Sequence, residues 1–188
     1  EKPLVPTLAQ AQHLVALARS QGVFLMEALW TRFLPLYDGL AGWLRDGAIG
    51  PVRAIQSSFC FAATYDPASR LFDPALAGGA LLDIGIYNLA VTRWVLEMSL
   101  GACPEPLRMH AHGVLAPTGV DQRVAGSIVF PQGVVSQFVC AFDGLAPNAL
   151  HIVGARGHIS VPDGFWHAVD AVRVRPGLAA VVGFVIGL

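Results

Sequence analysis

Charged residues are scarce in this 188-residue chain. They make up 13% of it, about half of the roughly 25% usual for soluble domains, while hydrophobic residues make up 54%. The net charge is −1 and there is no basic run, so the sequence lacks the electrostatic footprint of a nucleic-acid-binding protein. No apolar run approaches the roughly 18–20 residues that cross a bilayer, so we expect no membrane partner. The low charge instead predicts apolar surface that another domain or a partner chain covers.

Cysteine is rare as well. Cys60, Cys103 and Cys140 are odd in number and widely spaced, which favours reduced thiols over a disulfide framework and predicts a cytoplasmic protein. Cys60 and Cys140 lie in apolar, strand-like runs, where a cysteine most simply serves as a small buried side chain.

The sequence contains no G-x-G-x-x-G, the glycine pattern that holds the phosphates of a dinucleotide, because no two of its 20 glycines are two residues apart. A metal site is not indicated either. His110 and His112 stand two apart on a predicted strand and would face the same side, but no third ligand follows at a useful spacing. We therefore predict no bound metal.

Helical signals dominate the first half of the chain. Thr7 and Gln10 have the spacing of a capping box, and the alanine-rich run after them predicts a helix that Gly22 ends. Further helices are expected over residues 35–46, where the leucines fall on one face, and from residue 79 to about residue 100.

Strand signals dominate the second half. Beyond Pro106, short β-rich stretches alternate with turn sequences such as "PTG", "PQG" and "DGLAP". Strands joined by such short turns must run antiparallel. Earlier, "PVRAIQSSFCFAAT" predicts one long strand and "VFLMEAL" (residues 23–29) a short, fully buried one. The predicted fold class is α+β: a largely antiparallel open sheet with helices on one face.

Three polar residues could carry chemistry. Lys2 precedes Pro3, which pushes the lysine backbone towards an extended conformation, although a terminal lysine is most simply a solvated surface residue. Asp83 and Tyr87 stand four apart on the otherwise apolar third helix, so they share one face. A buried carboxylate there needs a partner, or it could be stabilised by the helix N-terminus alone.

Several stretches occur in the order found in one enzyme family: "EKP", "FLMEALWTRFLP", "GAIGPVRAI", "GGALLDIGIYNL" and "TGVDQRVAGSIVF". Over residues 1–162 the chain resembles the Gfo/Idh/MocA oxidoreductases. It is most similar to the branch that holds dihydrodiol dehydrogenases, NADP-dependent xylose dehydrogenases and glucose–fructose oxidoreductase. The resemblance implies a substrate and dimerisation domain like the C-terminal domain of glyceraldehyde-3-phosphate dehydrogenase.

The resemblance also implies roles for individual residues. Lys2, Asp83 and Tyr87 match the family's catalytic positions, with Tyr87 where histidine is commoner. The segment Glu1, Lys2 and Pro3 would lie against the nicotinamide of NADP or NAD. Residues implied to line the substrate pocket are Trp30 and Arg32, with Arg70 a weaker candidate that could equally form a surface salt bridge.

The implied function is NAD(P)-dependent oxidation or reduction of a sugar, polyol or dihydrodiol CH–OH group, in a homodimer formed through the open face of the sheet. Because the glycine fingerprint is missing, residues 1–28 are expected to be the tail of a truncated Rossmann domain. Residues 29–188 would be the substrate domain, itself shortened at its C-terminus. The alternative is a non-catalytic dimerisation or ligand-binding module.

Overall fold

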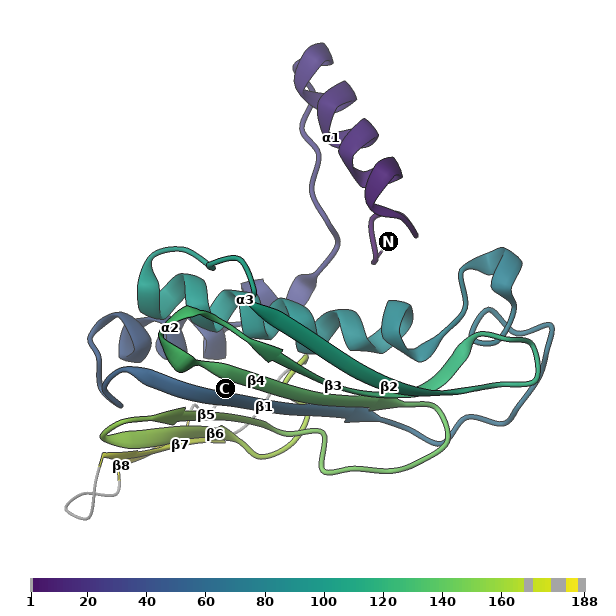
Figure 1. Ribbon diagram of the computed structural model, residues 1–188. Coiled ribbons are helices and arrows are strands. Elements are labelled where there is room, and N and C mark those ends of the chain that lie inside the picture. Colours follow the sequence, from purple (N-terminus) through teal and green to yellow (C-terminus); the bar gives the residue numbers. More distant parts are fainter. Residues whose placement is uncertain (1, 168–170, 177–181, 186–188) are drawn as a thin grey trace.

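The computed structural model describes residues 2–167, 171–176 and 182–185, and the statements below refer to these. It has two layers, a sheet and a set of helices that cover one face of it (Figure 1). The strands are β1 (Val52–Cys60), β2 (Arg108–Leu115), β3 (Asp121–Val129), β4 (Val135–Ala141), β5 (Leu150–Gly154), β6 (Gly157–Val161), β7 (Ala171–Pro176) and β8 (Val182–Val185). The helices are α1 (Leu8–Gln21), α2 (Pro35–Arg45) and α3 (Ile86–Leu100), with shorter helical turns at Trp30–Phe33, Pro74–Leu76, Leu81–Gly85 and Pro131–Gly133.

The eight strands form one sheet in the order β2-β3-β4-β1-β5-β6-β7-β8. In the second half, β2, β3 and β4 pair antiparallel in sequence order, and so do β5 to β8, as their short turns require. Strands β4 and β5, which the sequence predicted as neighbours across "DGLAP", do not pair. The early strand β1 enters the middle of the sheet, antiparallel to β5 and parallel to β4. The α+β class and the helix-covered sheet are thus confirmed. Strand β8 lies in an apolar tail for which the sequence predicted no strand.

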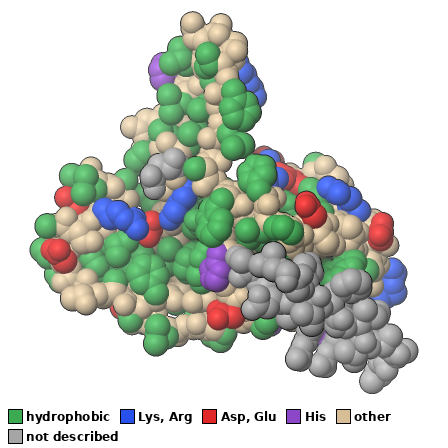
Figure 2. Space-filling model, turned by 180° about the vertical axis from the view of Figure 1, so that it is seen from behind, with side chains coloured by type: hydrophobic (Ala, Val, Ile, Leu, Met, Phe, Trp, Pro, Cys, Tyr) green, Lys and Arg blue, Asp and Glu red, His purple; other side chains and the backbone are tan. Residues whose placement is uncertain are grey.

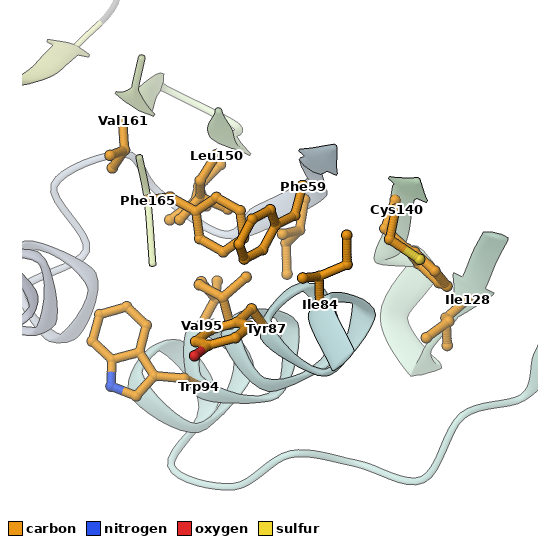
Figure 3. Packing of buried hydrophobic residues seen from close by; sticks show 14 of the residues in the cluster. Phe59, Ile84, Tyr87, Trp94, Val95, Ile128, Cys140, Leu150, Val161 and Phe165 are labelled. Carbon is orange, nitrogen blue, oxygen red and sulfur yellow. The ribbon is translucent and has the colours of Figure 1, made fainter. Parts of the chain in front are cut away.

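The hydrophobic core lies between the sheet and helices α2 and α3. Along α3, Tyr87 and Val95 point at the strands, towards Phe59 of β1 and Leu150 of β5 (Figure 3), whereas the Trp94 ring packs on Tyr37 of α2. Two buried polar contacts between side chains fix the orientation of α3 on the sheet. The amide of Asn88 donates to the hydroxyl of Ser57 at 2.8 Å, and the hydroxyls of Thr92 and Ser136 lie 2.7 Å apart. These contacts hold α3 against the two central strands β1 and β4.

The third helix differs from the predicted one in two ways. Its first turn, Leu81–Gly85, is π-helical, and regular α-helix begins only at Ile86. In addition, the helical segment Pro74–Leu100, with a mean hydropathy of 1.4, is long and apolar enough by composition to cross a membrane. Asp83, Arg93 and Glu97 interrupt this segment, so it holds no uninterrupted apolar run of that length. Here the segment packs as a core helix, since Val95 and Leu96 on α3 are fully buried.

The predicted strand at residues 23–29 is not formed. This segment, which we call the linker, has no strand partner among the described residues and runs extended between α1 and the body of the molecule. Most of its side chains are exposed, with Phe24 at 86% and Val23 at 60%, whereas Leu29 at its end is buried in the core. An apolar strand is stable only when neighbouring strands satisfy its backbone, and the described sheet offers this segment none. The exposed apolar side chains of the linker form apolar surface of the kind that the low charge of the sequence predicts.

Helix α1 stands clear of the two layers (Figure 1; Figure 2, from behind). The predicted capping box is confirmed, because the Thr7 side chain accepts from the Gln10 backbone N–H and the Gln10 side chain accepts from the Thr7 backbone N–H. Gly22 ends the helix in a left-handed conformation, φ 63°. Apart from Ala18, its residues are exposed or only partly buried. Local signals therefore shape α1, and packing contributes little.

The opposite face of the sheet is not covered by any described helix. It has a shallow groove of about 340 Å³ over β1, β4 and β5, where polar side chains such as Gln56, Gln137 and His151 stand beside small ones. In that groove the side-chain amide of Gln56 donates to the side-chain oxygen Oε1 of Gln137 at 3.0 Å. Farther along, His151 and Ser160 are 2.8 Å apart.

Candidate active site

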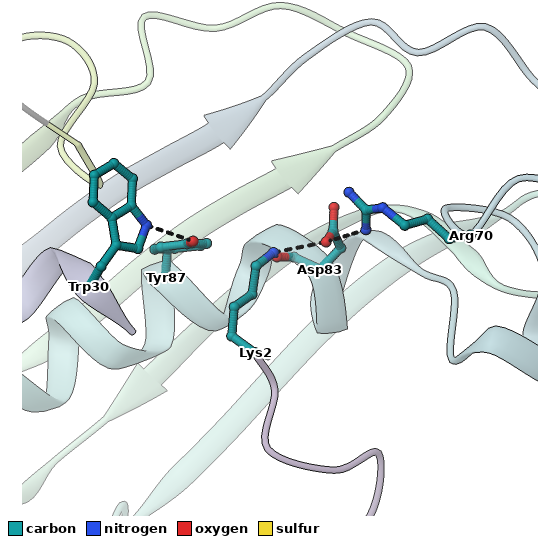
Figure 4. A network of polar contacts seen from close by, with 5 residues as sticks. All are labelled: Lys2, Trp30, Arg70, Asp83 and Tyr87. Atoms are coloured by element: carbon teal, nitrogen blue, oxygen red, sulfur yellow. Dashed lines mark hydrogen bonds and ion pairs between the residues drawn. The ribbon is translucent and has the colours of Figure 1, made fainter. Parts of the chain in front are cut away.

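The side chains of Lys2, Asp83 and Tyr87 meet above the start of α3 (Figure 4). Lys2 Nζ lies 2.8 Å from Asp83 Oδ1, and it also donates to the backbone carbonyl of Asp83. The same amine lies 5.1 Å from the centroid of the Tyr87 ring. The lysine and aspartate side chains are only 17% and 12% exposed. The structure thus brings together residues 81 positions apart in the chain.

Arg70 completes the polar cluster. Its Nη1 lies 2.8 Å from the Asp83 Oδ1 that Lys2 also contacts. Burial alone would raise the pKa of the Asp83 carboxyl, but the hydrogen bonds and charges of Lys2 and Arg70 outweigh burial and lower that pKa below its ordinary value. The carboxyl is therefore ionised, and it holds two cations side by side. Arg70 itself is 68% exposed, so most of its guanidinium faces solvent.

Tyr87 is held by aromatic neighbours. Trp30 Nε1 donates to Tyr87 Oη at 3.3 Å, and the Phe59 ring centroid lies 5.5 Å from that of Tyr87. Because Oη accepts from Trp30, its own proton remains available, and within the described residues that proton is donated to no acceptor. The arrangement thus combines a phenol with an available proton and an ammonium group over the face of the phenol ring. Such a pair can exchange a proton with a substrate hydroxyl.

The other predicted residues divide into two groups. Trp30 and Arg70 join the cluster, whereas Arg32 turns away and forms an ion pair with Glu97 at 2.8 Å. Arg32 lines a separate cleft of about 730 Å³ between the linker and helices α2 and α3. Pro3 is partly buried beside Lys2, and Glu1 lies outside the described residues. His110 and His112 are exposed on β2, and among the described residues no cluster of three potential metal ligands occurs.

The sequence interpretation missed Asp121. From the start of β3 its Oδ2 accepts the backbone N–H of Leu81 at 2.7 Å, at the entrance of the turn that carries Asp83. An aspartate directly after the turn sequence "PTGV" looks like an ordinary turn residue, so no local signal distinguishes it. A glycine two residues before Leu81 leaves room for this carboxylate. A Cβ on Gly79 would lie 2.5 Å from Asp121 Oδ1.

Residues 37–160 match the model of the GFO/IDH/MocA C-terminal domain. The chain belongs to this family. The Gfo/Idh/MocA relatives include trans-1,2-dihydrobenzene-1,2-diol dehydrogenase of Mus musculus, 40% identical over 84% of this chain and 45% of that one. The enzyme of the same name from Sus scrofa is 36% identical over 92% of this chain and 49% of that one. This chain thus spans about half the length of the relatives it matches.

Solved structures agree on the fold. The aldose-aldose oxidoreductase of Caulobacter crescentus, complexed with glycerol, superposes with a TM-score of 0.83 at 26% identity, over 97% of this chain and 54% of that one. The 3-ketoreductase KijD10 of Actinomadura kijaniata, in complex with NADP and TDP-benzene, gives a TM-score of 0.78 at 24% identity, over 98% of this chain and 55% of that one. The recognised family and the fold class are confirmed.

Proposed function

We propose that this chain is the substrate-binding part of an NAD(P)-dependent oxidoreductase that acts on a CH–OH group of a dihydrodiol, sugar or polyol. The observation that carries the proposal is the convergence of Lys2, Asp83 and Tyr87 in one cluster. The similarity to dihydrodiol dehydrogenases and to an aldose oxidoreductase supports the substrate class.

Each residue has a distinct task in this proposal. Tyr87 Oη exchanges the proton of the substrate hydroxyl, because it holds a proton that is not donated within the described residues. The Lys2 ammonium lies over the Tyr87 ring and stabilises negative charge that develops on the substrate oxygen. Asp83 fixes the lysine through two contacts. Arg70 offers its remaining N–H groups to polar parts of the substrate.

The described residues fit only the reactive end of a dinucleotide. Lys2 and Pro3 would lie against its nicotinamide, which accepts or supplies the hydride when bound. The glycine-rich turn for its phosphates is not in this sequence. We propose that residues 1–28 belong to the dinucleotide-binding domain and residues 29–188 to the substrate domain. Exposed α1 and the exposed linker support this division.

The test joins the Rossmann domain of the Mus musculus relative in front of this chain and measures nicotinamide absorbance with a trans-dihydrodiol and with xylose. Replacing Tyr87 by Phe should lower kcat by about 10²–10⁴-fold, the usual contribution of a positioned acid or base. The matched control is Tyr65→Phe, since Tyr65 is a partly exposed tyrosine that packs on Phe72 outside the cluster. Equal rates for both variants would overturn the proposal and favour a non-catalytic module.

We also propose that a second copy of the chain covers the open sheet face, in the cytoplasm where its three free cysteines stay reduced. The support is a sheet face that no described helix covers, with a shallow groove that a second copy could fill. Sedimentation velocity should give a dimer, and Gln137→Arg in the groove should give monomers. Equal sedimentation of wild type and variant as monomers would exclude this interface.

A further inference from the structure

The start of the π-helical turn Leu81–Gly85 is stabilised from outside the helix. Its N-cap residue Ala80 has no side chain that could accept a hydrogen bond. The acceptor comes instead from Asp121 on β3, whose carboxylate takes the Leu81 N–H at 2.7 Å. A carboxylate at the first N–H groups of a helix satisfies an otherwise unpaired donor and complements the helix dipole.

The backbone is shaped to admit this carboxylate. Gly79 adopts φ +123°, a conformation that L side chains rarely adopt, and a Cβ there would lie 2.5 Å from Asp121 Oδ1. The Gly79 carbonyl in turn accepts the Asp83 backbone N–H at 3.0 Å. Asp121 is thus connected to Asp83 through a single turn of backbone.

The polar cluster of the candidate site depends on this turn at two points. Lys2 contacts both the backbone carbonyl and the carboxylate of Asp83, so a displacement of the turn moves both acceptors together. The loop that carries Arg70 is attached to the same place, because the Gly79 N–H donates to the Leu71 carbonyl at 2.9 Å. Both cations that surround Asp83 are therefore positioned with respect to the same short segment.

We propose that Asp121 is a positioning residue of the candidate site: it holds the turn that carries Asp83, and through Asp83 it sets the position of the Lys2 amine. The inference deepens the proposed function, since the Lys2–Asp83 pair is its central element. Asp121 touches neither the lysine nor the tyrosine, so its effect is indirect.

The titration behaviour of Asp121 supplies a useful readout. Burial raises the pKa of its carboxyl, against the lowering effect of the backbone N–H groups that it accepts. On β4 the Cys140 thiol faces Asp121, and burial, with a smaller contribution from that carboxylate, raises the pKa of Cys140 to about 12, so the thiol stays neutral. The pKa of Asp83, by contrast, is lowered. As the pH falls, Asp121 is therefore protonated before Asp83.

The experiment follows the carboxyl carbon of Asp83 by NMR during an acid titration of the 188-residue chain, a readout that does not require turnover. Replacing Asp121 by Ala should raise the titration midpoint of Asp83 towards that of an ordinary aspartate, because Lys2 is no longer held against the Asp83 carboxylate. The Leu81 amide should exchange about 10- to 100-fold faster, which is the factor that corresponds to a lost hydrogen bond with a charged acceptor. Replacing Asp121 by Asn keeps an acceptor and should restore most of both signals.

The matched control is Asn148→Ala. It also removes a side-chain acceptor of a strand-bound N–H, that of Cys60 at 2.7 Å, but it lies outside the turn. It should leave the Asp83 midpoint unchanged. A folded Asp121→Ala variant with a wild-type Asp83 midpoint would overturn the proposal.

The wild-type chain tests the same point if Asp121→Ala does not fold. In the wild-type titration, the NMR signal of Asp83 should show two inflections. The first should occur at the pH at which Asp121 is protonated, which is higher than the pH at which Asp83 itself is protonated. A single inflection would refute the positioning role. Since no assay of hydride transfer enters either arm, a failure here is distinct from a failure of the proposed enzymatic function.

Discussion

The N-terminal segment (residues 2–29) and the body (residues 30–167) are organised by different forces. In the body, residues such as Leu40, Ile55 and Phe142 are almost completely buried, whereas Phe24 of the linker is 86% exposed. The segment reaches the candidate site through Lys2, whose amine is held by Asp83. The body thus has its own core, whereas the segment is fixed by local capping, by the contacts of Lys2 with Asp83 and by the buried Leu29 at its end. The predictions below test this difference, from the largest effect to the smallest.

Truncation in the core should have the largest effect. Phe142 is 1% exposed and packs against Phe61 and Phe72. Replacing it by Ala should lower the free energy of unfolding by about 3–5 kcal/mol, through lost burial and the cavity left behind. The matched change, Phe24→Ala in the linker, should cost no more than about 0.5 kcal/mol. Urea denaturation measures both, and a comparable loss for Phe24 would show that the linker packs into the body.

A methyl group added at the turn should have the next largest effect. Gly79→Ala forces a side chain into a left-handed backbone and against the Asp121 carboxylate, so we expect a loss of about 1–3 kcal/mol. The control is Gly39→Ala on the exposed face of α2, where a Cβ meets nothing within 4 Å. That change should stabilise the chain by about 0.4–1 kcal/mol. Thermal unfolding of the two variants gives opposite signs if the turn is as tightly packed as described.

The ion pair that attaches the segment should contribute on the order of 1 kcal/mol at neutral pH, since it is only partly exposed. The pKa of Asp83 is lowered in the folded chain, so this contribution is fully present above the ordinary aspartate pKa of about 3.9. It is lost as the pH falls through the folded value. Lys2→Ala should therefore be less stable than wild type at pH 7, and the two should converge in strong acid. A difference that stays constant with pH would mean that the pair does not form.

Loss of the capping box should have the smallest global effect. Thr7→Ala removes the acceptor at the start of α1 and should destabilise that helix by about 1 kcal/mol. Because α1 stands apart from the core, its amides should exchange faster while the global unfolding midpoint stays unchanged. Hydrogen exchange resolved by residue measures the two quantities together. A matching shift of the global midpoint would show that α1 unfolds with the body.

The sequence predicted most elements whose signals are local. The capping box at Thr7, the stop at Gly22 and the strands between short turns are confirmed, because propensity and turn chemistry decide them. The family motifs identified Lys2, Asp83 and Tyr87, and the geometry joins them. Arg32, however, pairs with Glu97 although it stands two residues after Trp30, since helical geometry turns neighbouring side chains apart.

Features that depend on distant partners could not be predicted. The linker reads as a buried strand because its composition is that of one, but burial also needs neighbouring strands. Asp121 reads as a turn residue because its partner, the Leu81 N–H, lies 40 positions earlier. The parallel pairing of β1 and β4 likewise follows from the whole topology and not from either strand.

The position of β1 has a consequence for how the chain folds during synthesis. This strand leaves the ribosome long before β4 and β5, the two strands that pair with it, so its apolar residues stay unpaired while the next 75 or so residues are made. Helix α3 is synthesised in that interval and can cover one face of β1, but the backbone N–H and C=O groups along both edges of the strand remain unpaired. A pause in translation before residue 135 would therefore leave a nascent chain with an exposed strand, a state that invites aggregation.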